Sequence, residues 1–480
     1  MSVPNKYIDS LILFMDSQEI KSRLYANDCL ISFLYKLEEF DVQKVIKTIS
    51  AMGETYFVWA KPGDEVFFIG FSPLITINVD GSNRLADTEK QIFEIGDKLL
   101  HNWEEFDLKN LPLFLGGMKF SSGKTSDLWE NFSDSDWFIP KYLFFNYKGS
   151  SYFLYNFYNT NNFLQNVLSD LGKPFDLIQN LDFDKSEPSL PEKISEVSEA
   201  KEMWFNKVES ALESIHLNRY QKIVLSRKID VGLDNKPAID VIIEKLSNKY
   251  PDCYIFAFHK SNSVFFGASP EKLARISDGW IEADALAGST SRGSTPEDDE
   301  IFANSLLNSE KNLIEQNAVV NFIVDSFSDF TDEIIYEPVP LIRKLPNIQH
   351  LWTPIRGKLK AKKSVFSILK EIHPTPAICG VPWSTALTHI IEMENYDRGL
   401  FTGIIGWFNF ECEGEFAVAI RSALLKDKLL HVFAGCGIVK GSNPEQEYEE
   451  TDLKLNAVLT LFENEKTNKS KHPLDTGICK

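Results

Sequence analysis

The sequence predicts a mixed α/β protein of the α+β type. Short apolar runs follow one another in groups, as in CYIFAF, SVFFGA and KLARIS between residues 253 and 277, with turn residues between them. Amphipathic helical patterns separate such groups, for example over residues 84–106. A hydrophobic content of 43% with 36 Phe supplies a large core. Grouped strands with separate helices favour strand meanders combined with helices.

The first 190 residues contain predicted strands and a helix but no catalytic motif, so we interpret them as scaffold. We expect strands at both ends of a Pro-Gly-Asp turn over residues 54–81, a helix over 84–106, and strands over 110–120 and 141–159. Residues 171–195 are polar with three prolines, and we predict a linker there.

The remaining chain alternates helices with groups of strands. In order, we expect a helix over residues 195–217, a strand over 220–231, four strands over 253–289, a long helix over 298–327, a strand over 350–359, a helix over 364–382 that a proline ends, strand runs over 403–408, 415–425 and 429–439, and a helix from Ser442-Asn443-Pro444. Residues 464–480 are expected to be a disordered tail.

Composition excludes several classes of function. A net charge of −19 argues against a nucleic-acid partner, because phosphate binding needs a basic surface. Six scattered cysteines without a CxxC pair suggest a reducing compartment. The N-terminus is not a convincing signal peptide, and no apolar stretch is long enough to span a bilayer. We therefore expect a cytoplasmic protein without a membrane partner.

Two of the last strand runs carry residues that are unusual in a buried strand. Arg421 lies inside the run of residues 415–425, where a charge must be paired or must meet an anion. Gly435 and Gly437 interrupt the run of residues 429–439, as glycine does where a ligand or another backbone approaches closely.

The last predicted helix presents two carboxylates and an ammonium on one face. Glu447, Glu450 and Lys454 are spaced i, i+3 and i+7. Beside a strand with a buried Arg, this pattern indicates a site for an anion and a metal. The simpler alternative is a solvated acidic helix with an ordinary Glu-Lys pair.

Two further residues are candidates for acid-base chemistry. Lys222 lies among Ile, Val and Leu, where an ammonium loses its proton more easily and the amine can serve as a base. Its structural alternative is a lysine that protects a sheet edge. Glu271 ends GASPE after an apolar strand, and it is a candidate acid or a residue near a helix start.

Two carboxylates on different predicted helices are candidate metal ligands. Glu315 and Glu450 together can hold Mg²⁺, which takes one or two carboxylates plus water. His350 and His373 are isolated, and such histidines are more often structural than catalytic.

None of these residues alone indicates one function, but together, in this order along the chain, they match a known family. Residues 195–462 resemble the chorismate-utilising enzymes, which comprise isochorismate, salicylate, anthranilate and aminodeoxychorismate synthases. The matching motifs are KIVLSR, GASPE, LAGSTSRG, SEKNLIE, HLWTPIRG, HPTPAICGVP, DRGLFTGIIGW, AIRSALL, FAGCGIV and EYEETDLK. GFSPL and PLFLGGMKF in the first half resemble the weaker half of this family.

The resemblance implies one large unit of stacked antiparallel sheets with helices outside, in which residues 1–190 are a scaffold half and residues 195–463 the chorismate-binding catalytic region. It implies Lys222 as the base that activates water and Glu271 as the acid for the leaving 4-hydroxyl. Mg²⁺ would be held by Glu315 and Glu450, with Glu447 helping through water. The implied substrate contacts are Gly288, Ser289, His350, Ala377, Phe401, Arg421, Gly435 and Lys454.

Four features select among the members. The position of Lys222 is typically Gln in the amine-introducing enzymes, and the position of Ala287 is a nucleophilic lysine in aminodeoxychorismate synthases. Residues 1–190 show no candidate glutaminase cysteine, so no glutaminase subunit is expected. HPTPAICGVP, over residues 373–382, looks like the isochorismate rather than the salicylate synthases.

We therefore predict an isochorismate synthase, an Mg²⁺-dependent isomerase that acts on chorismate as a monomer. The extended first half is more similar to the menaquinone and phylloquinone forms than to the siderophore forms. The alternatives are a salicylate synthase, which adds pyruvate elimination, an anthranilate synthase component I, and a non-catalytic binding paralogue. The last should lack one of Lys222, Glu271, Glu315 or Glu450, and all four are present.

Overall fold

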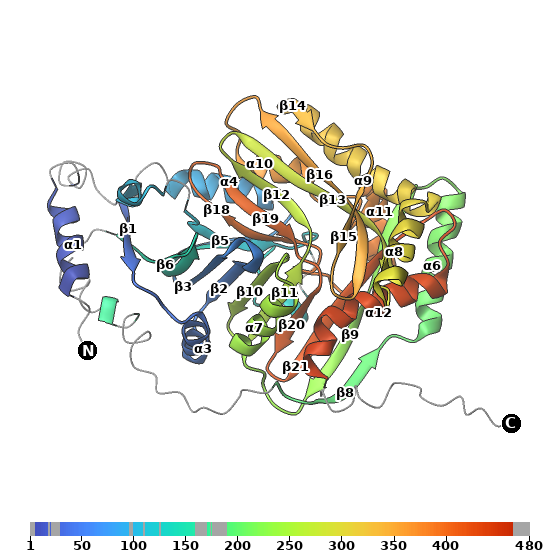
Figure 1. Ribbon diagram of the computed structural model, residues 1–480, viewed down its shortest axis with the longest axis horizontal. Helices are drawn as coiled ribbons and strands as arrows, with labels where there is room; N and C mark the ends of the chain where they lie inside the picture. Colours follow the sequence, from blue (N-terminus) through green and yellow to red (C-terminus); the bar gives the residue numbers. More distant parts are fainter. Residues whose placement is uncertain are drawn as a thin grey trace.

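The computed structural model describes most of the chain. The described residues are 5–17, 20, 29–95, 99–108, 111–123, 126–158, 170–172, 174 and 190–463. The predicted tail over 464–480 and most of the predicted linker lie outside them. Among the described residues, 21 strands form one hydrogen-bonded network that folds into two layers (Figure 1).

The first layer runs in the order β4–β1–β7–β6–β3–β2–β10–β11–β20–β21–β9, with β8 and β17 paired to β9. All of these pairings are antiparallel except β1 with β4. The strands are β1 Leu30–Leu37, β2 Tyr56–Lys61, β3 Val66–Val79, β4 Leu99–His101, β6 Ser135–Tyr147, β7 Ser150–Tyr158, β8 Lys193–Ser198, β9 Lys222–Leu233, β10 Tyr254–Lys260, β11 Ser263–Ser269, β17 Gly380–Val381, β20 Ser422–Lys426 and β21 Leu429–Val439.

The second layer continues from β6 through β5–β18–β19–β12–β13–β16, and β14 and β15 pair with β16. Strand β6 belongs to both layers, because β5 pairs with its first residues and β7 with its last ones, along the same edge. The strands are β5 Phe114–Met118, β12 Lys272–Ser277, β13 Trp280–Ser291, β14 Thr331–Ile335, β15 Leu341–Lys344, β16 Ile348–Leu359, β18 Ile404–Phe408 and β19 Gly414–Val418.

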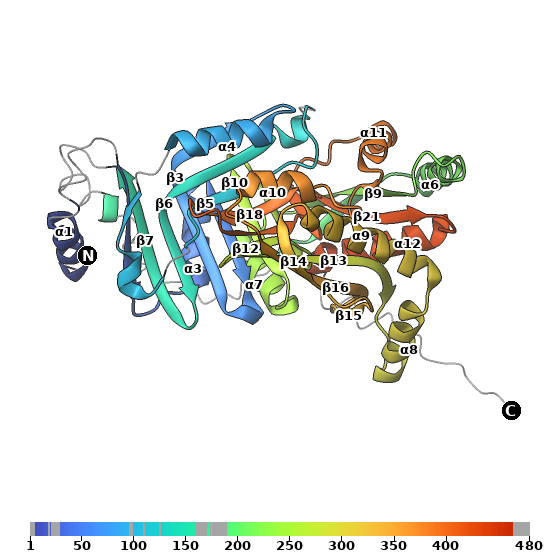
Figure 2. The same cartoon turned by 90° about the horizontal axis from the view of Figure 1, so that it is seen from above.

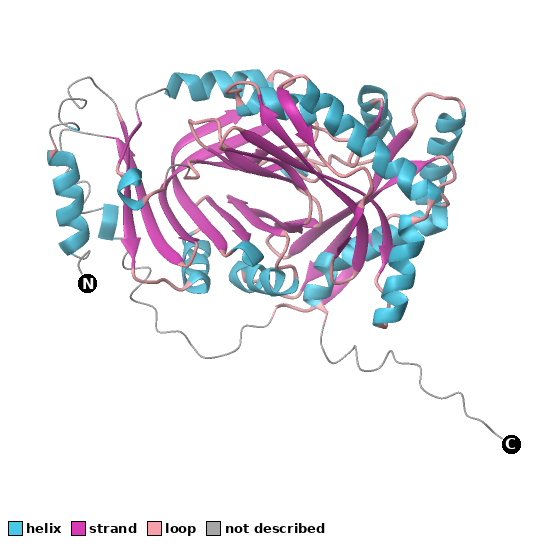
Figure 3. Cartoon of the chain, turned by 45° about the horizontal axis from the view of Figure 1, so that its top comes forward, coloured by secondary structure: helices cyan, strands magenta, loops and turns pink. Residues whose placement is uncertain are grey.

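An aromatic core fills the space between the layers. Phe57 and Phe258 from the first layer are fully buried beside Leu115, Ile405 and Ala417 from the second. Helices cover the outer faces (Figures 2 and 3). They are α1 Asn5–Asp16, α3 Val42–Met52, α4 Arg84–Ile95, α6 Lys201–His216, α7 Ile239–Lys249, α8 Pro296–Leu307, α9 Glu310–Ser328, α10 Val365–Ile372, α11 Trp383–Met393 and α12 Pro444–Leu459. Stacked antiparallel sheets with outer helices were the predicted fold class, which is confirmed.

The predicted meander over 253–289 is confirmed as β10 to β13, and the strand over 350–359 as β16. The Lys148-Gly149 turn joins β6 to β7 with positive φ at both residues, 49° and 71°, the geometry of a tight hairpin. Asn443 accepts hydrogen bonds from Glu445 and Gln446 and caps α12 as its sequence predicts.

Four predicted helices have different bounds. The helix over 364–382 ends at Ile372, and Gly380–Val381 pair with β9 as strand β17. The helix over 84–106 ends at Ile95, and residues 99–101 pair with β1 instead. The helix over 195–217 begins at Lys201, because residues 193–198 form the exposed strand β8. The long helix over 298–327 is two helices, since the Ser309 hydroxyl accepts from the Asn312 amide and starts α9 anew.

The strand run over 415–425 is also divided. Arg421 has φ 51°, in the left-handed region, and separates β19 from β20. Arg421 therefore lies at a kink between two strands, and the prediction that it lies inside one strand was wrong. None of the helices described is both long and apolar enough to cross a membrane.

Candidate active site

One pocket gathers most of the predicted site residues. Its walls come from β9, β13, β16, β21, α9 and α12, and from the segments around residues 377 and 400. The predicted residues that line it are Glu271, Gly288, Ser289, Glu315, His350, Ala377, Phe401, Arg421, Gly435, Glu450 and Lys454. Lys222 and Glu447 are not part of this lining, and each is 1% exposed.

Lys222 begins β9 and is only 1% exposed. Its Nζ lies 2.9 Å from Oε1 of Glu315 on α9, so the ammonium is paired with a carboxylate that lines the pocket. Gly437 makes this approach possible, because a Cβ there would lie 2.3 Å from Glu315 Oε1 and 2.8 Å from Lys222 Cε. The sequence predicted a ligand or another backbone close to the glycines of β21. At Gly437 two side chains approach instead, whereas a Cβ at Gly435 would lie 2.9 Å from the backbone oxygen of Leu225.

Glu271 lies in the short connection between β11 and β12 and is 3% exposed. Burial and the charge of Asp284 raise its pKa to about 8, against the opposing effect of Lys222. The carboxyl group is therefore protonated at neutral pH and can donate a proton into the pocket.

Arg421 and His350 form a buried pair. Nη2 of Arg421 lies 2.9 Å from Nε2 of His350, and Nδ1 of His350 lies 2.9 Å from Oγ of Ser289. Burial and the neighbouring guanidinium lower the pKa of His350 well below its usual range, so the imidazole is neutral. Ser289 faces His350 because Gly288, with φ 74°, forms a bulge in β13.

Glu450 lies on α12, opposite Glu315. Oε1 of Glu450 is 2.6 Å from Nζ of Lys454, which also donates to the Gly435 carbonyl at 2.9 Å. Burial favours the neutral acid, but the charge and hydrogen bond of Lys454 outweigh it and lower the pKa of Glu450. The carboxylate is therefore ionised, as a metal ligand must be.

Known proteins with this sequence pattern define the family. Residues 17–463 match the family model described as chorismate binding enzyme. The isochorismate synthase MenF of Bacillus subtilis (strain 168) is 31% identical over 419 residues, which cover 85% of this chain and 88% of that protein. The chain belongs to the chorismate-binding enzymes. The predicted family and the prediction of an enzyme are thus confirmed.

Solved structures agree with this chorismate-binding enzyme in fold. MenF, the menaquinone-specific isochorismate synthase from Escherichia coli, superposes with a TM-score of 0.77 at 20% identity, over 96% of this chain and 99% of that one. Anthranilate synthase component I from Streptococcus pneumoniae TIGR4 has a TM-score of 0.68 at 19% identity, over 82% and 92%. The fold is therefore shared by isochorismate and anthranilate synthases.

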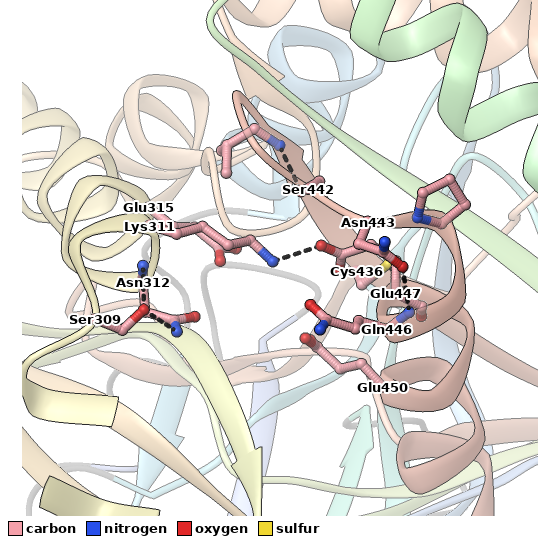
Figure 4. A network of polar contacts seen from close by, with 12 residues as sticks. Ser309, Lys311, Asn312, Glu315, Cys436, Ser442, Asn443, Gln446, Glu447 and Glu450 are labelled. Atoms are coloured by element: carbon pink, nitrogen blue, oxygen red, sulfur yellow. Dashed lines mark hydrogen bonds and ion pairs between the residues drawn. The ribbon is translucent and has the colours of Figure 1, made fainter. Parts of the chain in front are cut away.

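Glu447 of this chorismate-binding enzyme is 1% exposed and pairs with Lys311 on α9 (Figure 4). Burial and the nearby Glu450 raise the pKa of Glu447, against the charge of Lys311. Among the described residues, no group of three or more His, Cys, Asp or Glu side chains is arranged to hold a metal. Two pocket carboxylates, Glu315 and Glu450, are consequently the candidate protein ligands, and a role for Glu447 through water stays a prediction.

Sequence reasoning gave no role to Lys311 or to a buried network around Arg398. Arg398 lines the pocket, pairs with Glu394 at 2.6 Å and donates to the carbonyls of Ile378 and Val224. It thereby fixes the segment that carries Ala377. Glu394 and Arg398 lie beyond the end of α11 at Met393, so no helical spacing in the sequence reveals their pair.

His373 has a structural role. Its Nε2 lies 3.0 Å from the Thr402 carbonyl, and burial lowers its pKa to about 4. It is absent from the pocket lining, as expected for the commoner structural kind of histidine.

Proposed function

We propose that the chain is an isochorismate synthase, which converts chorismate reversibly to isochorismate. The observation that carries this proposal is a protonated Glu271 in the pocket lining, together with Lys222 paired with Glu315 of the same lining. An amine and a neutral carboxylic acid are the pair needed to activate water and to protonate a leaving hydroxyl. The 31% identity with isochorismate synthase MenF over 85% of the chain supports the same activity.

Chorismate is a dicarboxylate, and the pocket offers cationic and amide groups to bind it. Arg421 uses one of its donors on His350 and is buried at the kink that points it into the pocket. Lys454 and the backbone around Gly288 and Gly435 complete this side of the pocket. Ala377 and Phe401 supply apolar contacts for the ring.

The donor set fits Mg²⁺. Glu315 and Glu450 come from two helices, line the same pocket and leave room for water and a substrate carboxylate, which is the usual Mg²⁺ arrangement. When bound there, the cation would neutralise the carboxylates that meet in the pocket and hold one carboxylate of the substrate. Glu447 would contribute through water.

The proton transfers fall to Lys222 and Glu271. Nζ of Lys222 takes a proton from the water whose oxygen bonds to C2 of chorismate, the ring double bonds shift, and the bond from C4 to its hydroxyl breaks. Glu271 donates the proton that lets the hydroxyl leave as water. A base needs a neutral amine, so the ion pair of Lys222 with Glu315 has to open before water is activated.

The test is an end-point assay with purified protein, chorismate and Mg²⁺, with products separated by chromatography. Isochorismate without pyruvate is the expected result. Salicylate together with pyruvate would make the chain a salicylate synthase instead. Anthranilate formed from ammonia would make it an anthranilate synthase component, and no turnover would favour a binding paralogue.

A further inference from the structure

A row of four hydrogen-bonding side chains crosses one wall of the pocket. Arg421 contacts Nε2 of His350 at 2.9 Å, and Nδ1 of His350 contacts Oγ of Ser289 at 2.9 Å. Ser289 and His350 are direct cross-strand neighbours in β13 and β16. The Ser289 hydroxyl in turn hydrogen-bonds the carboxylate of Glu450. The row thus connects the substrate side of the pocket with a candidate metal ligand.

Chemistry fixes the direction of every link. A guanidinium can only donate, so Nε2 of His350 must accept from Arg421. The hydrogen of the neutral imidazole is then on Nδ1, which has Oγ of Ser289 and the backbone of Gly288 as its acceptors. The serine hydrogen is left for Glu450, whose ionised carboxylate can only accept. A protonated imidazole would place an N–H against the N–H of Arg421, and at 4% exposure no bulk water would separate them.

From this geometry we infer that His350 and Ser289 are positioning residues for Glu450. Their directional hydrogen bonds tie the orientation of this carboxylate to Arg421, so metal affinity depends on two side chains that do not contact the metal. The inference rests on the proposed function, because the metal at Glu450 and the carboxylate at Arg421 come from it. A substitution of His350 should therefore weaken Mg²⁺ binding if it removes the contact with Ser289. It should weaken chorismate binding if it removes the contact with Arg421.

Two pairs of variants separate this role from packing. Ser289→Ala removes the link to Glu450, whereas Ser289→Thr keeps a hydroxyl. His350→Gln keeps an acceptor near the Nε2 position for Arg421 but no donor for Ser289. His350→Asn keeps a donor near the Nδ1 position but loses the contact with Arg421. Size alone would not make His350→Gln weaken metal binding while His350→Asn leaves it nearly unchanged.

The first measurement is Mg²⁺ binding to the full chain without substrate, by titration calorimetry. Ser289→Ala and His350→Gln should each weaken binding about tenfold, the value of one hydrogen bond to a charged group. Ser289→Thr and His350→Asn should stay within about threefold of wild type, while His350→Asn raises KM for chorismate. Equal losses within either pair would overturn the inference, and so would a wild-type chain that binds no Mg²⁺.

The second measurement is the tautomer of His350 by nuclear magnetic resonance of ¹⁵N-histidine-labelled protein, with His350→Asn to assign the signal. A neutral ring with its hydrogen on Nδ1 is expected, and hydrogen on Nε2 or on both nitrogens would overturn the inference. Neither measurement of metal or tautomer needs turnover. A chain that made no isochorismate would refute the proposed function. The results for Mg²⁺ binding and for the tautomer of His350 could still be interpreted.

Discussion

At the scale of single residues, the pocket contains ionisable groups in opposite states. Glu271 is a neutral acid, while Glu450 and Arg421 are charged, although all of them touch the same pocket. The difference arises from neighbours, because Glu450 has Lys454 within 2.6 Å and Glu271 has no comparable ion pair among the described residues. The roles proposed for these groups, as acid, metal ligand and anion-binding residue, therefore follow from differences in their environment.

Replacing Lys222 by Ala should lower kcat at least ~100-fold with chorismate, because a general base contributes about that much. The control is Lys228→Ala, which lies on the same strand and is paired with Asp230 near the surface. Steady-state kinetics of both proteins check this. A Lys222→Ala enzyme within about tenfold of wild type would exclude the base role.

Glu271 gives a pH prediction. Its pKa of about 8 in the folded state exceeds the ordinary value of 4.5, so kcat/KM should fall as pH rises through about 8 and the acid is lost. The folded state also retains this proton longer than the unfolded one. Stability from this group is therefore lost as pH rises from about 4.5 to about 8.

Urea unfolding of wild type and Glu271→Gln at several pH values measures the stability effect. The uncharged variant should lack this part of the pH dependence, and it should lose activity at all pH values. Parallel stability curves for the two proteins would show that Glu271 is ionised in the folded state.

At the scale of elements, the break between α8 and α9 aims the residues of α9 at the pocket. Ser309 caps α9, and the first two turns carry Lys311, which pairs with α12, and Glu315, which pairs with β9. A single long helix would continue the direction of α8. The cap is thus one local cause of the site geometry.

Ser309→Ala should reduce the free energy of unfolding by about 1 kcal/mol, the usual value of such a cap, and should weaken Mg²⁺ binding because Glu315 is less well held. Ser309→Asp keeps a side-chain acceptor and is the matched control. Denaturant titration and calorimetry check both effects. Equal stability of the alanine and aspartate variants would remove the cap from this explanation.

Sequence patterns predicted the strands and helices with long apolar periodicity well, including β9 to β13 and β21. They did not predict β4, which is only three residues long, or β8 and β14, which are six and five residues long and largely exposed. Motif order located Lys222 and Glu271. Lys311 was missed because its role depends on Glu447, 136 positions away, and sequence proximity gives no sign of that contact.

At the scale of the whole molecule, the predicted scaffold half and the predicted catalytic half share their sheets. Strand β2 pairs with β10 and strand β5 with β18, so hydrogen bonds cross between the halves in both layers. The aromatic core between the layers also draws on both halves. The halves are therefore parts of one cooperative structure.

We expect one unfolding transition for the whole chain, with coincident curves from circular dichroism and tryptophan fluorescence. A fragment of residues 195–463 should not fold alone, because it would expose the edges of β10 and β18 and half of the core. Two separate transitions, or a folded and soluble fragment, would contradict this expectation.

Strand β6 has a consequence for which sequence changes the chain can accept. Its residues are paired with β3 along one edge and with β5 and β7 along the other. An inserted residue inside β6 would reverse the facing of every side chain beyond it and would put both sheets out of register at once. An insertion at the Lys148-Gly149 hairpin would leave all of these pairings intact. Length variation among relatives should therefore accumulate at that hairpin and not within β6, because β6 sets the strand register of both layers.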